Sequence, residues 1–140
     1  VLPSRVDDGF LEWLASLPWR VTLVLHVNHA NELQGDAAEA IERLRGTGAL
    51  LLNQAVLLRG VNDEAETLVA LSKRLHDLGV APYYLHLLDR VNGTAHFEVS
   101  EARGKELVTA MAEALPGFLV PKLAREMPGR EAKTVLAAGL

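Results

Sequence analysis

One short segment, PGREAKTVL at residues 128–136, holds a lysine that could take part in chemistry. Its glycine followed by Lys133-Thr134 suggests a phosphate-binding loop. Such a loop needs G-x-x-x-x-G-K-[ST], because the second glycine lets backbone N–H groups wrap the phosphate, and Ala132 occupies that place. Lys133 is therefore not predicted to bind a nucleotide phosphate. From its type alone, a solvated surface lysine is the favoured interpretation.

Two other segments carry groups that bind metals or ligands. HVNHAN at residues 26–31 offers His26 and His29, but residues three apart on a strand point to opposite faces and cannot easily share one ion. A hydrogen-bonded loop is the favoured interpretation of this pair. Asn53 and Gln54 interrupt an apolar run, where a buried amide needs hydrogen-bond partners. For Gln54, ligand contact and structural hydrogen bonding are equally supported.

Two acids and two tyrosines also lie in or next to apolar segments. Asp89 and Glu126 each follow such a segment, where a helix cap or a salt bridge is slightly favoured over a ligand role. Tyr83 and Tyr84 are predicted to pack within a strand, with one hydroxyl group able to reach a pocket. The type and position of these residues leave their function open.

The elements that must position these residues follow from hydrophobic periodicity. An amphipathic helix over 10–17, with Asp7 or Asp8 as its N-cap, comes first. Asp63 and Glu66 are predicted to form a capping box at a later helix. The first of four predicted strands is almost uninterruptedly apolar, which is typical of a strand buried on both faces. We predict strands over 20–27, 49–59, 81–89 and 117–125, and helices over 36–46, 63–79 and 100–115.

Four strands that alternate with three helices indicate βα units and a parallel sheet of the α/β class. The pattern matches half of a barrel. In such folds, ligands and reacting groups gather at the carboxyl ends of the strands. The polar residues named above fall at or near these ends, so we expect them to lie at one edge of the sheet.

Composition limits the classes of function. The 140 residues are 49% hydrophobic, with 14 basic and 18 acidic residues spread without a run of like charge, so nucleic acid is not an expected partner. No apolar run approaches the roughly 20 residues that span a bilayer, and no signal peptide is recognised, so a cytoplasmic location is expected. The chain has no cysteine, which excludes disulfides and cysteine-ligated iron–sulfur clusters within it.

The motifs taken together resemble a known family. In order, HVNHANE, LLNQAVLLRGVND, APYYLHLLD, GTAHF, LVPKLARE and PGREAKT resemble the C-terminal half of lysine 2,3-aminomutases, which are radical S-adenosylmethionine (SAM) enzymes that also use pyridoxal 5′-phosphate (PLP). The resemblance covers about residues 5–136. PYYLH, VPKLARE and the early stop after the lysine are most similar to the branch that makes (R)-β-lysine for elongation factor P. The implied fold is the C-terminal half of a (β/α)8-type radical SAM barrel.

The resemblance implies roles for particular residues. Lys133 matches the lysine that binds PLP covalently, and Asp89 matches an aspartate that pairs with an amino group of the substrate L-lysine. Glu126 occupies the place of a second such acid, where the free-lysine enzymes have aspartate. His26 and Gln54 match positions on the SAM side of the pocket, and His86 stands where the free-lysine enzymes have tyrosine. The implied reaction moves the α-amino group of L-lysine to C3.

The chain departs from the family because it lacks the C-x-x-x-C-x-x-C segment that holds the 4Fe-4S cluster. We expect a fragment that is inactive alone, with a half-barrel over 1–127 and a tail over 128–140 that carries Lys133. The missing N-terminal half of the barrel is its expected partner, and the elongation factor P pathway enzymes are indirect ones. Two alternatives stay open: an inactive half-barrel that binds PLP or lysine, and a structural piece that self-associates as a homo-oligomer through its exposed edge strands.

Overall fold

A five-stranded sheet forms the centre of the protein. The computed structural model describes residues 3–88, 95–125 and 134–136. The strand order follows the chain, and the first four strands pair in parallel while the fifth pairs antiparallel to the fourth. The predicted parallel sheet is therefore confirmed. The strands are β1 (Thr22–His26), β2 (Leu50–Leu57), β3 (Val80–Leu87), β4 (Lys122–Arg125) and β5 (Thr134–Val135).

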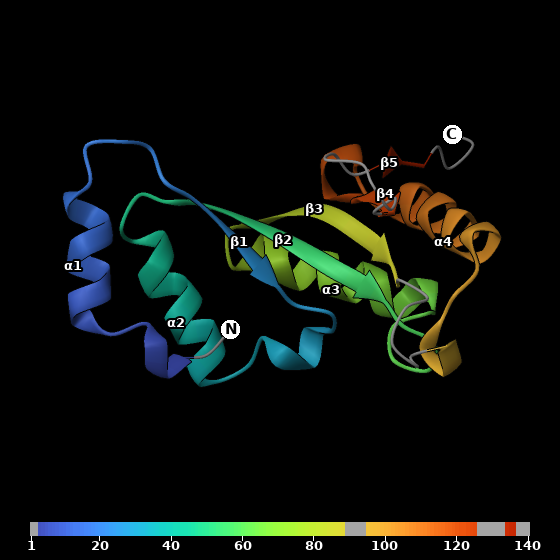
Figure 1. Cartoon of the computed structure of the whole chain (residues 1–140), viewed down its shortest axis with the longest axis horizontal. Coiled ribbons are helices and arrows are strands. Elements are labelled where there is room, and N and C mark those ends of the chain that lie inside the picture. Colours follow the sequence, from blue (N-terminus) through green and yellow to red (C-terminus); the bar gives the residue numbers. More distant parts are fainter. Residues whose placement is uncertain (1–2, 89–94, 126–133, 137–140) are drawn as a thin grey trace.

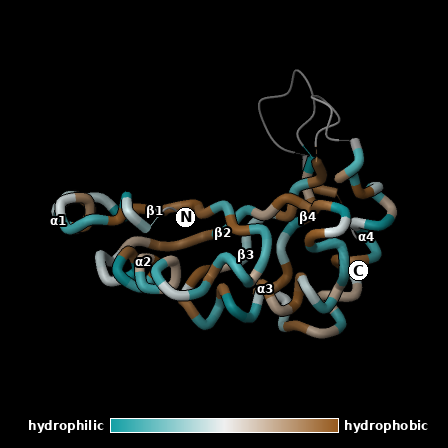
Figure 2. Tube along the Cα trace, turned by 90° about the horizontal axis from the view of Figure 1, so that it is seen from below, coloured by the Kyte–Doolittle hydropathy of each residue, from teal (hydrophilic) through white to brown (hydrophobic). Residues whose placement is uncertain are grey.

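Helices connect the parallel strands and pack on one face of the sheet (Figures 1 and 2). A strand order that follows the chain, with the usual right-handed crossovers, places every connecting helix on the same side. This arrangement is typical of a barrel and differs from a doubly wound sheet, which has helices on both faces. The helices are α1 (Asp8–Ser16), α2 (Asp36–Arg45), α3 (Ala65–Asp77) and α4 (Glu101–Ala114), with short 3-10 turns η1 (Pro3–Arg5), η2 (Ala30–Glu32), η3 (Ala95–Phe97) and η4 (Gly117–Leu119).

The core lies between the sheet and the helices. Alternate residues of β2 that face the helices are 4% exposed or less, and the stripe of leucines predicted along α3 is fully buried against them. The other face of the sheet has no helix over it in the described part of the chain. The prediction that the first strand is buried on both faces is wrong, because Thr22, Val24 and His26 on this second face are exposed.

The helix starts confirm one cap prediction and contradict another. The backbone N–H of Phe10 donates to the carboxylate of Asp7 at 2.8 Å, which makes Asp7 the N-cap of α1. The capping box predicted from Asp63 and Glu66 is wrong. The helix α3 begins after Glu64, which makes no side-chain cap, and the Asp63 carboxylate instead accepts a hydrogen bond from Gly60 N–H at 2.9 Å. Gly60 has φ +78°, so a tight turn aims its N–H at Asp63.

The last strand is shorter than predicted. Residues 117–119 form the turn η4, and β4 begins only at Lys122, after Pro121. Proline has no N–H to give to a sheet ladder, which explains why pairing starts after it. The edge strand β5 was not predicted. It pairs Val135 with Ala124 and Thr134 with Arg125.

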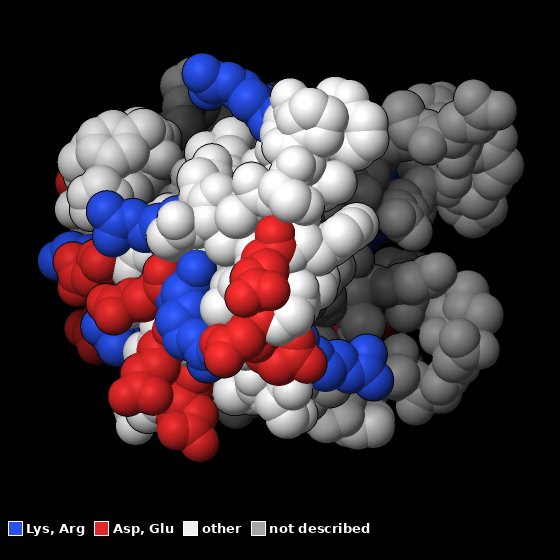
Figure 3. Space-filling view, turned by 90° about the vertical axis from the view of Figure 1, so that its left-hand side faces the viewer, with Lys and Arg blue, Asp and Glu red and all other residues white. Residues whose placement is uncertain are grey.

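Acidic and basic side chains are interspersed over the end of the molecule formed by α1 and α2 (Figure 3). One pair there is a salt bridge of 3.1 Å between Arg43 of α2 and Asp8 of α1. About half of the Arg43 side chain and nearly all of the Asp8 side chain are exposed to solvent, so the pair adds little stability. Within the described residues, none of the helices has the length and apolar character needed to cross a membrane.

Candidate active site

Four of the residues singled out from the sequence, His26, Gln54, Tyr84 and His86, lie on the sheet face that no described helix covers. Parallel register pairs His26 with Gln54, Gln54 with Tyr84, and Val56 with His86, and paired residues of a parallel sheet point to the same side. We call this the uncovered face. Its members on the first three strands are Thr22, Val24, His26, Leu50, Leu52, Gln54, Val56, Ala81, Tyr84 and His86.

The polar members of the uncovered face form a row near the carboxyl ends of the strands. His26 is exposed and Gln54 is half-buried. The ring of His86 lies 5.4 Å from that of Tyr84 between centroids, and its Nε2 atom is shielded from solvent. An amide, two imidazoles and a phenol therefore adjoin one another, which gives hydrogen-bond donors and acceptors above an otherwise apolar surface.

The structure separates His29 from this row. His29 is the N-cap of η2, and its Nδ1 accepts a hydrogen bond of 3.0 Å from the backbone N–H of Asn31. The favoured interpretation of a hydrogen-bonded loop agrees with this contact. In the portions of the chain that the structure describes, no three histidine, aspartate or glutamate side chains are grouped so that they could hold a metal ion.

A buried asparagine holds the end of β1 next to β2. The side chain of Asn53 accepts a hydrogen bond from Val27 N–H at 2.9 Å and donates one to Val27 C=O at 3.0 Å. Asn53 is 2% exposed, and its neighbour in sequence is Gln54. The sequence indicated that this amide needs partners but did not identify them.

Two further asparagines, which sequence reasoning missed, continue this connection. Asn28 Oδ1 accepts from Val56 N–H at 2.9 Å. Asn62, which is 1% exposed, accepts from Leu58 N–H at 2.8 Å and donates at 2.9 Å to the carbonyls of Asn28 and Val56. We call Asn28, Asn53 and Asn62 the asparagine cluster. Its signal in the sequence was an asparagine in each of the segments HVNHAN, LLNQ and GVND.

The loop after β2 is tied to the segment that precedes α4. Arg59 N–H donates to Phe97 C=O at 2.8 Å, and its guanidinium donates twice to Glu98 C=O at 3.1 and 2.8 Å. These bonds hold residues 97–98 beside the carboxyl end of β2. Asp89 lies outside the described residues.

The antiparallel strand β5 brings two further chain segments together. Arg125 at the end of β4 pairs with Thr134 at the start of β5, and Leu136 N–H donates to Leu123 C=O at 2.8 Å. Residues 126–133 therefore connect Arg125 and Thr134, which are paired at the carboxyl end of β4. Glu126 and Lys133, predicted to bind substrate and PLP, belong to this connection and lie outside the described residues.

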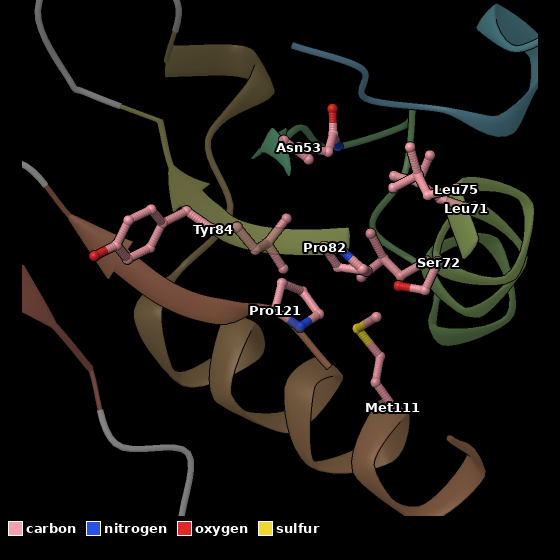
Figure 4. A pocket seen from close by; sticks show the side chains of 11 residues that line it. Asn53, Leu71, Ser72, Leu75, Pro82, Tyr84, Met111 and Pro121 are labelled. Atoms are coloured by element: carbon pink, nitrogen blue, oxygen red, sulfur yellow. The ribbon is translucent and has the colours of Figure 1, made fainter. Parts of the chain in front are cut away.

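A small cavity between the sheet and the helices is too small for a ligand. It has a volume of about 10 Å³, which is room for one water molecule at most. Figure 4 shows Ser72 of α3, Met111 of α4 and two prolines around it, whereas the ring of Tyr84 points away. The polar row on the uncovered face is thus the better candidate for a binding site.

Comparison with known proteins supports the resemblance seen in the motifs. The chain is 47% identical over 136 residues to L-lysine 2,3-aminomutase of Escherichia coli, which is 97% of this chain and 40% of that protein. It is 43% identical over 137 residues to the Haemophilus influenzae protein of the same name and 34% identical over 134 residues to that of Clostridium subterminale. The chain is homologous to part of these aminomutases. It spans about two fifths of the length of the first two relatives. No family model matches the chain.

A solved structure supports the fold. A radical SAM methyltransferase from Sphaerobacter thermophilus superposes with a TM-score of 0.62 over 84% of this chain and 37% of its own length. The sequence identity is 20%, so the likeness concerns the fold alone. The expectation of a partial barrel is confirmed by this neighbour together with the four parallel strands.

Proposed function

We propose that this chain is the part of an L-lysine 2,3-aminomutase that supplies four consecutive barrel strands and the lysine for PLP. The full-length protein then moves the α-amino group of L-lysine to C3 and releases (R)-β-lysine. The observation that carries this proposal is the 47% identity to the Escherichia coli aminomutase over nearly the whole chain. Since the chain spans about two fifths of that relative, the activity is proposed for the full-length protein.

The polar row of the uncovered face fits a SAM site. His26 and Gln54 are register partners, and His86 lies on the next strand beside Tyr84, the register partner of Gln54. Their imidazole and amide groups can hydrogen-bond the adenosine and amino-acid parts of SAM. When bound, SAM supplies the 5′-deoxyadenosyl radical that removes a hydrogen atom from C3 of the substrate. The three side chains would orient SAM at the carboxyl edge of the sheet.

The residues of this chain do not fit an iron–sulfur cluster. The chain has no cysteine, and thiolates are the usual ligands of a 4Fe-4S cluster. The cluster of the proposed enzyme would thus depend on residues outside this chain, in the N-terminal half of the barrel. This chain supplies no thiolate ligand to the cluster that reduces SAM.

Lys133, Asp89 and Glu126 are proposed to hold PLP and the substrate. When bound, PLP supplies a conjugated π-system that stabilises the substrate radical during amino migration. The amine of Lys133 would attach the cofactor, which requires that it lose its proton in a desolvated site. Asp89 and Glu126 would accept charge-assisted hydrogen bonds from an amino group of L-lysine. The pairing of Arg125 with Thr134 supports this assignment, because it keeps both ends of the connection that carries Lys133 at the carboxyl end of β4.

The proposed biological role is the supply of (R)-β-lysine in the cytoplasm for the modification of elongation factor P. It rests on the similarity of PYYLH and VPKLARE to the branch of the family with that task. A product of the opposite configuration, or elongation factor P that gains no β-lysyl group in cells that make the protein, would contradict this assignment.

Turnover by the full-length protein tests the proposed reaction. The protein is reconstituted with iron, sulfide, PLP and SAM, reduced with dithionite, and incubated with L-lysine labelled with ¹⁵N at the α-amino group. We expect β-lysine that carries the label on C3, detected by chiral chromatography and mass spectrometry. Unchanged lysine in a preparation whose cluster and PLP are both spectroscopically present would contradict the proposal.

A further inference from the structure

The hydrogen bonding between β1 and β2 changes at the proposed SAM-binding residues. The ladder of paired residues ends at His26 and Gln54. Val27, the residue that follows β1, bonds through both of its backbone groups to the side chain of Asn53. A carboxamide thus replaces the backbone of a neighbouring strand at the point where β1 leaves the sheet.

This replacement fixes the direction of the chain after His26. Val27 is 1% exposed, so its N–H and C=O would lie buried without a partner if the carboxamide were absent. Asparagine supplies one donor and one acceptor from a single short side chain, which matches the two groups of Val27. With Val27 held in the core, the side chain of His26 remains on the uncovered face beside Gln54.

The rest of the asparagine cluster ties this junction to neighbouring parts of the fold. Asn62 donates to the carbonyls of both Asn28 and Val56, so it bridges the chain after β1 to the end of β2. Arg74 of α3 adds two bonds of 3.1 and 2.9 Å to Leu33 C=O, farther along the same loop. The segment that follows His26 is therefore held from both the sheet and a helix.

We propose that Asn53 is a positioning residue that sets His26 and Gln54 in place for SAM. It acts through Val27 on one side and through its own peptide bond to Gln54 on the other. Asn28 and Asn62 hold the same junction and assist it. The inference rests on the proposed function, because His26 and Gln54 are SAM ligands only there.

The test uses the full-length holoenzyme with Asn53→Ala and two matched controls. Asn31→Ala removes an exposed amide of the same loop, and Val108→Ala opens a cavity at a buried position of α4. The SAM dissociation constant is measured by equilibrium dialysis. The ring resonances of histidine-labelled protein are recorded without SAM, and thermal unfolding is measured for each variant.

We expect Asn53→Ala to weaken SAM binding by about tenfold or more and to shift the His26 resonance while leaving that of His76 in place. Val108→Ala should lower the melting temperature without either effect, and Asn31→Ala should change neither property. An unmoved His26 resonance in folded Asn53→Ala protein would overturn the inference. If the His26 resonance moves but the SAM affinity is unchanged, Asn53 does position His26, and the proposed contact of His26 with SAM is refuted. If Asn53→Ala does not fold, Asn53→Asp, which keeps the acceptor for Val27 N–H, undergoes the same measurements with the same outcomes.

Discussion

At the scale of single residues, the hydrogen bonds of the asparagine cluster predict how the stability of an Asn62 variant depends on pH. In Asn62→Asp the new carboxyl group keeps an acceptor for Leu58 N–H but faces the carbonyl oxygens of Asn28 and Val56. Burial and these oxygens favour the neutral acid, which raises its pKa in the folded protein above the usual value of about 3.9. The variant should therefore be less stable than the wild type, and more so at pH 7.5 than at pH 5.

The direction of this pH dependence follows from the linkage between proton binding and folding. A group whose pKa is raised by folding contributes its stability below the unfolded pKa and loses it as the pH rises through the folded pKa. Urea denaturation of the full-length variant and wild type at the two pH values checks the prediction. Asn31→Asp, at an exposed position, is the control and should show a small and constant difference. A loss of unfolding free energy in Asn62→Asp that is the same at both pH values would count against the assigned hydrogen bonds.

The sequence could place some site residues but not their supports. His26 could be assigned to the carboxyl edge of the sheet because it lies toward the end of a predicted strand, whereas Gln54 and His86 are assigned as SAM-side or cofactor positions only through the resemblance. The bonds that join Asn28 to Val56 and Asn62 to Asn28 could not be predicted, since these partners are far apart in the sequence and meet only through the strand register. Asp89, Glu126 and Lys133 stay predictions that rest on the resemblance.

At the scale of elements, Gly104 sets how closely α4 packs on the sheet. A Cβ atom at this position would lie 3.2 Å from Leu123 and from Leu87. Valine would push α4 away from β3 and β4, so Gly104→Val should lower the free energy of unfolding by about 2 kcal/mol. Ala102→Val on the exposed side of the same helix is the control for β-branching. Equal melting temperatures for the two variants would contradict the close packing.

A second prediction at this scale concerns the pairing of β5 with β4. Leu136→Pro removes the N–H that donates to Leu123 C=O, so it should release β5 from β4 and reduce PLP attachment severalfold while the melting temperature falls little. Hydrogen-bonding direction alternates along a strand, so the N–H of Val135 points away from β4 and Val135→Pro is a matched control. Visible absorption of bound PLP in the two full-length variants makes the comparison. If both variants bind PLP like the wild type, the pairing of β5 with β4 does not support PLP attachment.

Prediction of the elements from the sequence succeeded where hydrophobic periodicity is strong. The leucine stripe of α3 follows from the side-chain pattern. The three parallel pairings among β1, β2, β3 and β4 follow from the short connections between strands and helices. The capping box failed because Asp63 had a closer donor in the turn at Gly60. The short strand β5 was missed because two residues carry no periodic signal, and its position depends on Arg125 and Ala124 as partners.

At the scale of the whole molecule, the uncovered face predicts that this chain alone does not stay a monomer. Leu50 on that face is 57% exposed and Val24 is 37% exposed, and Trp19, just before β1, is 70% exposed. A large contiguous apolar surface is rarely left in water, so self-association of the isolated 140-residue chain is expected. Light scattering after size exclusion tests this, and Leu50→Glu should shift the mass toward the monomer. A stable monomer of the unmodified chain would contradict the prediction.

The most direct test of the account is the site at which PLP becomes fixed. Full-length protein is incubated with PLP, reduced with borohydride, digested and mapped by mass spectrometry. The proposed role of Lys133 predicts that the cofactor is found on the peptide containing Lys133, that Lys133→Ala and Lys133→Arg abolish the label, and that Lys122→Ala on β4 retains it. Label on another lysine, or full labelling together with normal β-lysine formation in Lys133→Ala, would contradict the proposed role of Lys133.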